Sequence, residues 1–308
     1  MSPPLISIVT PSYNQAEYLE ETIRSVQEQD YPHVEHIVID GDSDDDSADI
    51  LRAYDDNLAY WVSEPDRGQS HAINKGLEQA TGDILAYLNS DDFYLPGTFE
   101  AVAELYRESP EAGLLHGRCR YVNEQGEKVG SQYGQFESVA DLLDLWEVWW
   151  SEQQVVQPEV FWTRDVYERV GGFREDLNYV MDYDYWLRTL LEGFDLVRVD
   201  REFTAFRFQP NQKSEESEAV ASELLNCVRP YLWGKASLPL PTRIYLQGQW
   251  LHHACFLPAV ERSLEKGQSK HQRWKMLLRL TAQHPQIVFS RGVRHRLYSI
   301  LTSITSKS

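Results

Sequence analysis

The chain has 308 residues, 42% of them apolar, which is enough for one large α/β domain with an appendage or for two modest domains. Its 48 acidic and 29 basic residues give a formal net charge of −19, which argues against nucleic-acid binding because nucleic acids are polyanions. The three cysteines lack CxxC spacing, so we expect neither a disulfide framework nor a thiolate zinc site, and a reducing compartment fits best. No secretory signal and no run of about 18 uncharged apolar residues is visible, which favours a cytoplasmic protein that is soluble or peripheral to a membrane.

Short apolar runs alternate with helical patterns through the first hundred residues, which predicts β-α-β units around a mainly parallel sheet. The expected strands are 5–10, 34–40, 58–62 and 83–88, and the expected helices are 17–29, 47–54, 69–80 and 98–108. Longer loops then separate three more strand-like segments, at 113–122, 155–162 and 195–206. These segments indicate added mixed or antiparallel pairing, and the predicted fold class is α/β.

Strand signals stop near residue 230, and helical patterns follow at roughly 241–262, 270–282 and 286–303. We therefore expect a first domain over 1–230 and a basic helical extension over 231–308. The segment 266–308 holds nine basic residues and no acidic one, whereas the other 265 residues hold 20 basic and 48 acidic residues. Such a segment could lie on an anionic membrane surface, or it could form a helical cap on the acidic body.

Three of the expected strands end in polar segments, at 10–14, 40–43 and 89–92. In an open α/β sheet, ligands bind beyond the carboxyl ends of the strands. Carboxylates gathered there repel one another unless a cation or hydrogen-bond donors compensate, so a divalent metal that holds a diphosphate is the economical explanation. Each segment also has a simpler interpretation, because an aspartate at a strand end often caps the next helix or forms a turn.

Several segments of the chain occur together in a recognisable order: SIVTPSYN at 7–14, VIDGDSDDDS at 38–47, SEPDRGQSHAINKG at 63–76, TGDILAYLNSDD at 81–92, GGF at 171–173, MDYDYWLR at 181–188 and AFRF at 205–208. From about Ile6 to Lys213 the chain thereby resembles the inverting family 2 glycosyltransferases of the GT-A fold. The resemblance implies a Rossmann-like, mainly parallel sheet flanked by helices. It is specific for the family but not for the sugar.

By this resemblance, the first two strand ends bind the nucleotide of a nucleotide-diphosphate sugar. Pro11, through its backbone, and Tyr13 are expected to hold the base, while Asp40 and Asp42 contact base or ribose. An aromatic face with a carboxylate that accepts an imide N–H suits a pyrimidine, which favours a UDP-sugar. Many family members carry a second acid where this chain has Gly41, so the identity of the base stays open.

The resemblance also assigns the diphosphate and metal residues. Arg67 is expected to reach the nucleotide, with a surface ion pair to Glu64 or Asp66 as the alternative. Asp92 occupies the place of the metal ligand, and Asp91 that of a contact to ribose or to metal-bound water. Oxygen ligands of this kind select Mn²⁺ or Mg²⁺.

The remaining site residues come from the second half of the resemblance. Asp182 takes the place of the catalytic base, which inversion requires on the face opposite the diphosphate. Arg207 and Lys213 flank a loop that would close over the diphosphate as a lid. Gln157 and Trp150 are expected near the acceptor, with core packing or a lipid-facing edge as the alternative for the tryptophan.

The expected function is that of a metal-dependent inverting glycosyltransferase of the hexosyltransferase type. It would move a sugar to a hydroxyl of a glycan or lipid-linked acceptor, in polysaccharide or glycolipid synthesis at the cytoplasmic face of the membrane. Two other classes remain open: a signalling domain phosphorylated on Asp40, and a nucleotide-sugar binder without activity. Rapid labelling of Asp40 by acetyl phosphate would mark the first, and donor binding without turnover would mark the second.

Overall fold

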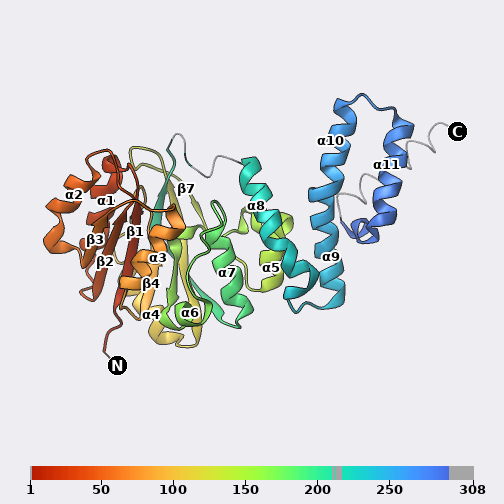
Figure 1. Ribbon diagram of the computed structural model, residues 1–308. Helices are drawn as coiled ribbons and strands as arrows, with labels where there is room; N and C mark the ends of the chain where they lie inside the picture. Colours follow the sequence, from red (N-terminus) through yellow and green to blue (C-terminus); the bar gives the residue numbers. More distant parts are fainter. Residues whose placement is uncertain (1, 210–211, 213–216, 291–308) are drawn as a thin grey trace. The chain divides into compact units, whose positions relative to one another are not determined.

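The computed structural model describes residues 2–209, 212 and 217–290, without the side chains of 151–153, 217, 270 and 274. The chain divides into two compact units (Figure 1). One comprises residues 1–138 and 150–220, and the other comprises residues 139–149 together with those from 221 onward. The second unit thus includes a segment from the middle of the chain. The sequence predicts one boundary, at residue 230, and does not indicate this segment. None of the helices described is long and apolar enough to cross a membrane.

The first unit is built on one mixed sheet with the strand order β3-β2-β1-β4-β8-β6-β9-β5, and β7 pairs with β6 beside it. Its parallel part consists of β1 (Ile6–Ser12), β2 (Val34–Asp40), β3 (Tyr60–Ser63) and β4 (Ile84–Tyr87). The mixed part consists of β5 (Phe93–Tyr94), β6 (Ala112–Val122), β7 (Lys128–Gln132), β8 (Val160–Thr163) and β9 (Asp195–Arg207). In it, β6 runs parallel to β9, and the other pairings are antiparallel. The predicted α/β class, with a mainly parallel first half, is confirmed.

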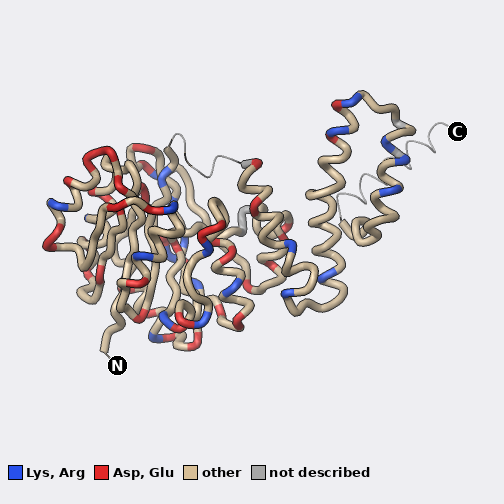
Figure 2. The backbone as a smooth tube through the Cα atoms, in the orientation of Figure 1, with Lys and Arg blue, Asp and Glu red and all other residues tan. Residues whose placement is uncertain are grey.

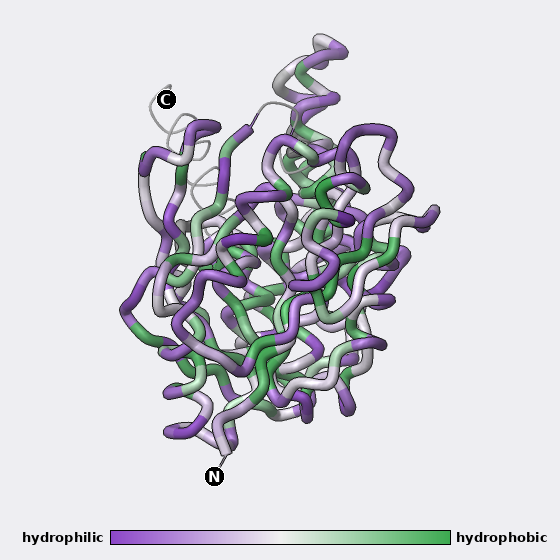
Figure 3. Tube along the Cα trace, turned by 90° about the vertical axis from the view of Figure 1, so that its left-hand side faces the viewer, coloured by the Kyte–Doolittle hydropathy of each residue, from purple (hydrophilic) through white to green (hydrophobic). Residues whose placement is uncertain are grey.

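Helices connect these strands: α1 (Ala16–Gln27), α2 (Ser47–Ala53), α3 (Gln69–Gln79), α4 (Thr98–Glu108), α6 (Arg164–Val170) and α7 (Met181–Leu191). Leu19 and Ile23, one turn apart on α1, pack with Val38 of β2 because helical spacing places both on one face. On α3, Gly76 permits close contact with β1, since a Cβ there would lie 2.3 Å from Val9 Cγ1. Figure 3 shows the apolar strands running through the interior of this unit.

The second unit is helical. It contains α5 (Val139–Leu143), most of α8 (Ser217–Pro230), α9 (Leu240–Leu251), α10 (Leu257–Glu265) and α11 (Lys270–Gln283). Leu251, Phe256, Leu277 and Ile287 form a small core. The ring of Trp146 stacks on that of His253 with centroids 3.6 Å apart, which attaches the segment 139–149 to the junction between α9 and α10. Aromatic stacking therefore explains why this mid-chain segment belongs to the C-terminal unit.

Some predicted elements differ from the observed ones. The strand expected at 155–162 starts only at Val160, because Gln157–Glu159 form a 3-10 turn that contains Pro158. The long helix expected at 241–262 is interrupted by a π-helical turn at His252–Phe256. The helix expected at 286–303 begins as a 3-10 turn, Pro285–Phe289, and its remainder from 291 lies outside the described residues.

Candidate active site

The loops that follow β1 and β2 are tied to each other. Asn14 donates its backbone N–H to Ser43 Oγ at 2.8 Å and accepts the N–H of Asp44 on its side-chain oxygen at 2.9 Å. Asn14 and Asp42 both have positive φ, at 53° and 66°, a conformation that short polar side chains tolerate. This loop pair leaves the ring of Tyr13 60% exposed next to buried Pro11, so Tyr13 is open to a ligand.

Asp40 lies at the end of β2 and is fully buried. Its Oδ1 accepts from Ser43 Oγ at 2.6 Å, and its Oδ2 accepts from Ser43 N at 3.1 Å and from Ser63 Oγ at 2.7 Å. These bonds fix the turn after β2 and link it to β3. Both carboxylate oxygens are thus engaged inside the protein, while Asp42, two residues on, is exposed.

Arg67 lies in the loop before α3 and is paired with a residue that the sequence did not suggest. Its Nε and Nη2 contact Glu175 Oε2 at 3.1 and 2.7 Å. The hydrogen bond from Arg67 lowers the pKa of the Glu175 carboxyl. The predicted alternative partners are engaged elsewhere, because Glu64 pairs with Lys75 and Asp66 accepts the N–H of Gly68. The Arg67 side chain remains 67% exposed and accessible to an anion.

After β4, the turn 89–92 carries the two aspartates expected to serve the metal. Asp92 is 1% exposed, and its Oδ1 accepts the backbone N–H of Arg207 at 3.0 Å. Asn89 Nδ2 lies 3.5 Å from Asp92 Oδ2. Asp91 Oδ2 accepts from Gln209 Nε2 at 2.5 Å. Both carboxylates are therefore oriented by neutral donors.

Burial dominates the electrostatics of this turn. Desolvation, followed by the negative charge of Asp91, raises the pKa of Asp92 well above its usual value. Desolvation also raises the pKa of Asp91, although Gln209 and Arg207 act in the opposite direction. A bound cation would favour the ionised form of both carboxylates.

The donor set of this turn fits Mn²⁺ or Mg²⁺. The described residues contain no group of three or more His, Cys, Asp or Glu side chains that could hold a metal alone. Magnesium commonly takes one or two carboxylates from the protein and completes its shell with water and substrate phosphates. One or two aspartate oxygens from the turn 89–92 match that pattern.

Asp182 is the second residue of α7, and its Oδ1 accepts the N–H of Tyr183 at 2.7 Å. Tyr87, the last residue of β4, is buried and is affected by the charges of both Asp182 and Asp92. Its pKa is raised well above the usual value by burial, and then by the negative charges of Asp182 and Asp92. Asp182 and Asp92 are thus both close enough to Tyr87, at the end of β4, to act on its pKa. Asp40 lies two strands away, beyond β1.

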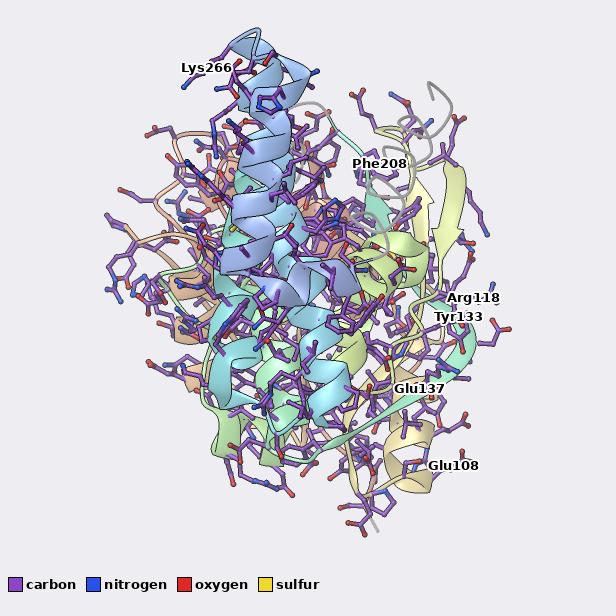
Figure 4. All side chains as sticks on the ribbon, turned by 90° about the vertical axis from the view of Figure 1, so that its right-hand side faces the viewer. Glu108, Arg118, Tyr133, Glu137, Phe208 and Lys266 are labelled. Atoms are coloured by element: carbon purple, nitrogen blue, oxygen red, sulfur yellow. The ribbon has the colours of Figure 1, made fainter. Side chains whose placement is uncertain are left out.

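Arg207 is placed differently from a lid residue. It is the last residue of β9 and only 2% exposed, and its guanidinium contacts Asp91 O at 3.0 Å, Glu124 O at 2.6 Å and Glu21 Oε2 at 2.5 Å. The same group lies 4.7 Å from the ring centre of Tyr18. Arg207 therefore holds the turn 89–92 from its protein side, and the exposed residue is its neighbour Phe208 (Figure 4). Lys213, its predicted companion, lies outside the described residues.

The two predicted acceptor residues occupy different environments. Gln157 is 7% exposed, donates to Tyr87 O at 2.8 Å and lies 3.4 Å from Asn89 Nδ2, so it supports the turn 89–92. Trp150 is 39% exposed and is the first residue of the first unit's second segment. Gln69 completes the support by donating to Asn89 Oδ1 at 2.7 Å.

Asp184, two residues after Asp182, has a structural role. It is fully buried and pairs with Arg188 Nε at 2.7 Å and Arg174 Nη1 at 3.4 Å. Arg188 also donates to the carbonyls of Val170 and Gly172. Asp184 thus connects α7 to the segment that precedes it.

Comparisons with known proteins agree with this geometry. The model of the family described as glycosyl transferase family 2 matches residues 7–170. An uncharacterized glycosyltransferase of Mycobacterium tuberculosis is 32% identical over 194 residues, which are 62% of this chain and 70% of the relative. The putative teichuronic acid biosynthesis glycosyltransferase TuaG of Bacillus subtilis is 40% identical over 108 residues, which are 34% of this chain and 43% of TuaG.

Two solved structures share the fold. A Staphylococcus aureus TarS structure in complex with UDP-GlcNAc has a TM-score of 0.63 at 17% identity, covering 82% of this chain and 73% of that one. The mannosyltransferase PcManGT from Pyrobaculum calidifontis, in complex with GDP-Man and Mn²⁺, has a TM-score of 0.61 at 19% identity, covering 100% of this chain and 89% of that one. These likenesses show the GT-A fold. The chain belongs to glycosyl transferase family 2, and the predicted family is confirmed.

Proposed function

We propose that this protein is a metal-dependent, inverting glycosyltransferase that uses a UDP-sugar and glycosylates a hydroxyl of a cell-surface polysaccharide or its lipid-linked precursor. The observation that carries the proposal is the carboxylate pair at the end of β4, where Asp92 is buried and Asp91 is half-buried beside it, and where burial raises the pKa of both. TarS has been solved with UDP-GlcNAc and with UDP, and TuaG is named for teichuronic acid synthesis. These names support a UDP-sugar and a polysaccharide acceptor.

In this proposal, the turn 89–92 and α7 divide the work. Asp92, with Asp91 beside it, would hold Mn²⁺ or Mg²⁺. PcManGT, which shares the fold, was solved with Mn²⁺. When bound, the cation supplies positive charge that stabilises the departing diphosphate. Asp182 takes the proton from the acceptor hydroxyl as that oxygen attacks the anomeric carbon. Arg207, Asn89 and Gln157 keep the turn in place.

Burial of Asp40 supports a glycosyltransferase over a phosphorylated signalling domain. A phosphoacceptor aspartate must present an oxygen to an incoming phosphoryl group, whereas Asp40 is fully buried and accepts three hydrogen bonds. A binder without activity differs from an enzyme in what happens after the donor binds, and only the enzyme needs a base such as Asp182.

We infer that α11 provides a contact to anionic lipid, which would keep the enzyme near a lipid-linked acceptor. The helix has four basic residues and no acidic one (Figure 2), and Leu278 is 61% exposed between Lys275 and Arg279. Lys266 adds charge at the turn between α10 and α11 (Figure 4). Flotation with vesicles that contain phosphatidylglycerol should fall when Lys275 and Arg279 are both changed to Glu, and Arg52→Glu should have no effect. Equal flotation of all three proteins would contradict the contact.

The enzyme assignment is tested by thermal shift and turnover. UDP-sugars with Mn²⁺ should raise the melting temperature more than GDP-, dTDP- or CDP-sugars, because ligand binding stabilises the native state. Asp182→Asn should retain this shift and lose turnover by at least about 100-fold, the effect of removing a general base. Asp165→Asn, an exposed aspartate of the same unit, is the matched control. Turnover by Asp182→Asn at the wild-type rate would reject the assigned role.

A further inference from the structure

Gly41 leaves room for a carboxylate from another loop. A Cβ on Gly41 would lie 2.8 Å from Asp66 Oδ2 and 3.3 Å from Tyr13 Cδ2. The first distance is too short for a real contact, so any side chain at 41 would displace Asp66. The Asp66 carboxylate therefore occupies the space where a residue-41 side chain would project, beside the exposed ring of Tyr13.

Asp66 is held so that one oxygen remains available. Its Oδ1 accepts the backbone N–H of Gly68 at 2.7 Å, at the start of α3. Its Oδ2 accepts no hydrogen bond from the described residues. Asp40 differs in both respects, because it is fully buried and both of its oxygens accept hydrogen bonds within the protein. Of these two carboxylates, Asp66 is the one that can accept a bond from a ligand on Tyr13.

We propose that Asp66 is the residue that selects the base, by accepting the N3–H of a uracil that lies against Tyr13. Asp40 then acts as a positioning residue for the turn after β2. One free oxygen matches the single imide N–H of uracil, whereas guanine presents two neighbouring donors, which suit a carboxylate with both oxygens free. The assignment rests on the proposed function and names the residue that would favour UDP over CDP and GDP.

The test compares UDP with N3-methyl-UDP, which lacks the donor, by calorimetry on the full chain with Mn²⁺. The wild-type protein should bind N3-methyl-UDP at least about tenfold more weakly than UDP, as expected for a lost hydrogen bond to a charged group. Asp66→Ala should bind UDP at least about tenfold more weakly than wild type and should discriminate little between the two nucleotides. Gly41→Ala should behave similarly, because the added methyl group displaces Asp66 while the backbone at 41 is not left-handed.

Two controls separate this inference from the proposed function. Asp46→Ala removes an exposed carboxylate from the neighbouring loop and should bind UDP like wild type. Wild-type affinity for UDP in Asp66→Ala, or equal binding of UDP and its N3-methyl form by wild type, would overturn the assignment of Asp66. GDP binding that depends on Asp66 would overturn the choice of uracil alone. A wild-type chain that binds neither UDP nor GDP would contradict the proposed function itself.

Discussion

Asp92 and Asp184 are both buried aspartates of the first unit, but their surroundings differ. Asp184 has two arginines within ion-pair distance, and each of them makes further hydrogen bonds. Asp92 is held by a backbone N–H and a nearby amide, and no basic side chain of the described residues pairs with it. The nearest candidate, Arg207, directs its guanidinium to Glu21 and to backbone carbonyls.

The difference separates a structural carboxylate from a binding one. A buried charge that the protein neutralises itself contributes to the packing of the fold. A buried carboxylate that the protein orients but does not neutralise has its pKa raised, and it gains most from a cation that arrives with a ligand. The two aspartates should therefore respond in opposite ways to the same substitution.

Asp92→Asn should show the largest effect, and it should appear in catalysis. The amide keeps an acceptor for Arg207 N but removes the charge that would hold the cation, so turnover should fall by about 1,000-fold or more. Its free energy of unfolding without metal should equal or exceed that of wild type, since a buried charge has been removed. Steady-state rates check the expected loss of turnover, and urea denaturation checks the expected free energy of unfolding. If Asp92→Asn turned over at the wild-type rate with an unchanged Mn²⁺ requirement, Asp92 would not be a binding carboxylate and would not differ in role from Asp184.

Asp184→Asn should show the reverse pattern. It leaves Arg188 and Arg174 without their buried partner, and we expect a loss of about 2–3 kcal/mol in the free energy of unfolding, reduced from the fully buried case because both arginines are partly exposed. Affinity for UDP and Mn²⁺ should remain within about twofold of wild type. Asp176→Asn, which removes the exposed partner of the same Arg174, should cost less than about 1 kcal/mol. A stable Asp184→Asn protein with weakened UDP binding would place Asp184 in the nucleotide site.

Local features of the fold were predictable from the sequence. The β-α-β rhythm of the first hundred residues follows from apolar spacing alone, and the observed β2 and α4 have the expected bounds, 34–40 and 98–108. The π-helical turns and the membership of 139–149 in the second unit were not predictable, because they depend on contacts such as Trp146 with His253, over a hundred residues apart. Local propensity carries no information about such contacts.

The candidate site shows the same limit. The acidic turn 89–92 and Asp182 could be found from the sequence, since strand ends and motifs mark them. The partner of Arg67 could not, because Glu175 lies 108 residues away and no local pattern connects the two. The buried position of Arg207 could not be predicted either. An arginine beside a polar loop suggests solvent exposure, whereas the sheet buries Arg207 and directs its guanidinium to the carbonyl of Asp91. The role of Asn89 could have been suspected from the sequence, because this residue lies within the segment TGDILAYLNSDD at 81–92.

The pH dependence of stability gives a smaller but direct measure of the same contrast. Because the pKa of Asp92 is raised in the folded state, the folded protein keeps this proton to a higher pH than the unfolded chain does. Without metal, the wild-type protein should therefore lose stability, relative to Asp92→Asn, as pH rises from about 4, the value of an unfolded aspartate, through the raised pKa. The loss amounts to about 1.4 kcal/mol for each unit by which the pKa is raised.

Urea denaturation of both proteins across this pH range isolates Asp92 together with Asp91, whose charge acts on it, because groups that do not interact with Asp92 cancel in the difference. Glu159, whose pKa burial also raises, and His116, whose pKa burial lowers to about 4, are such groups. Mn²⁺ should reduce the wild-type loss above the raised pKa, since the cation favours the ionised carboxylate, and it should leave Asp92→Asn unchanged. A wild-type protein that instead gains stability over Asp92→Asn as pH rises, without metal, would mean that the folded chain already neutralises Asp92. The turn 89–92 would then be a structural ion pair like that of Asp184.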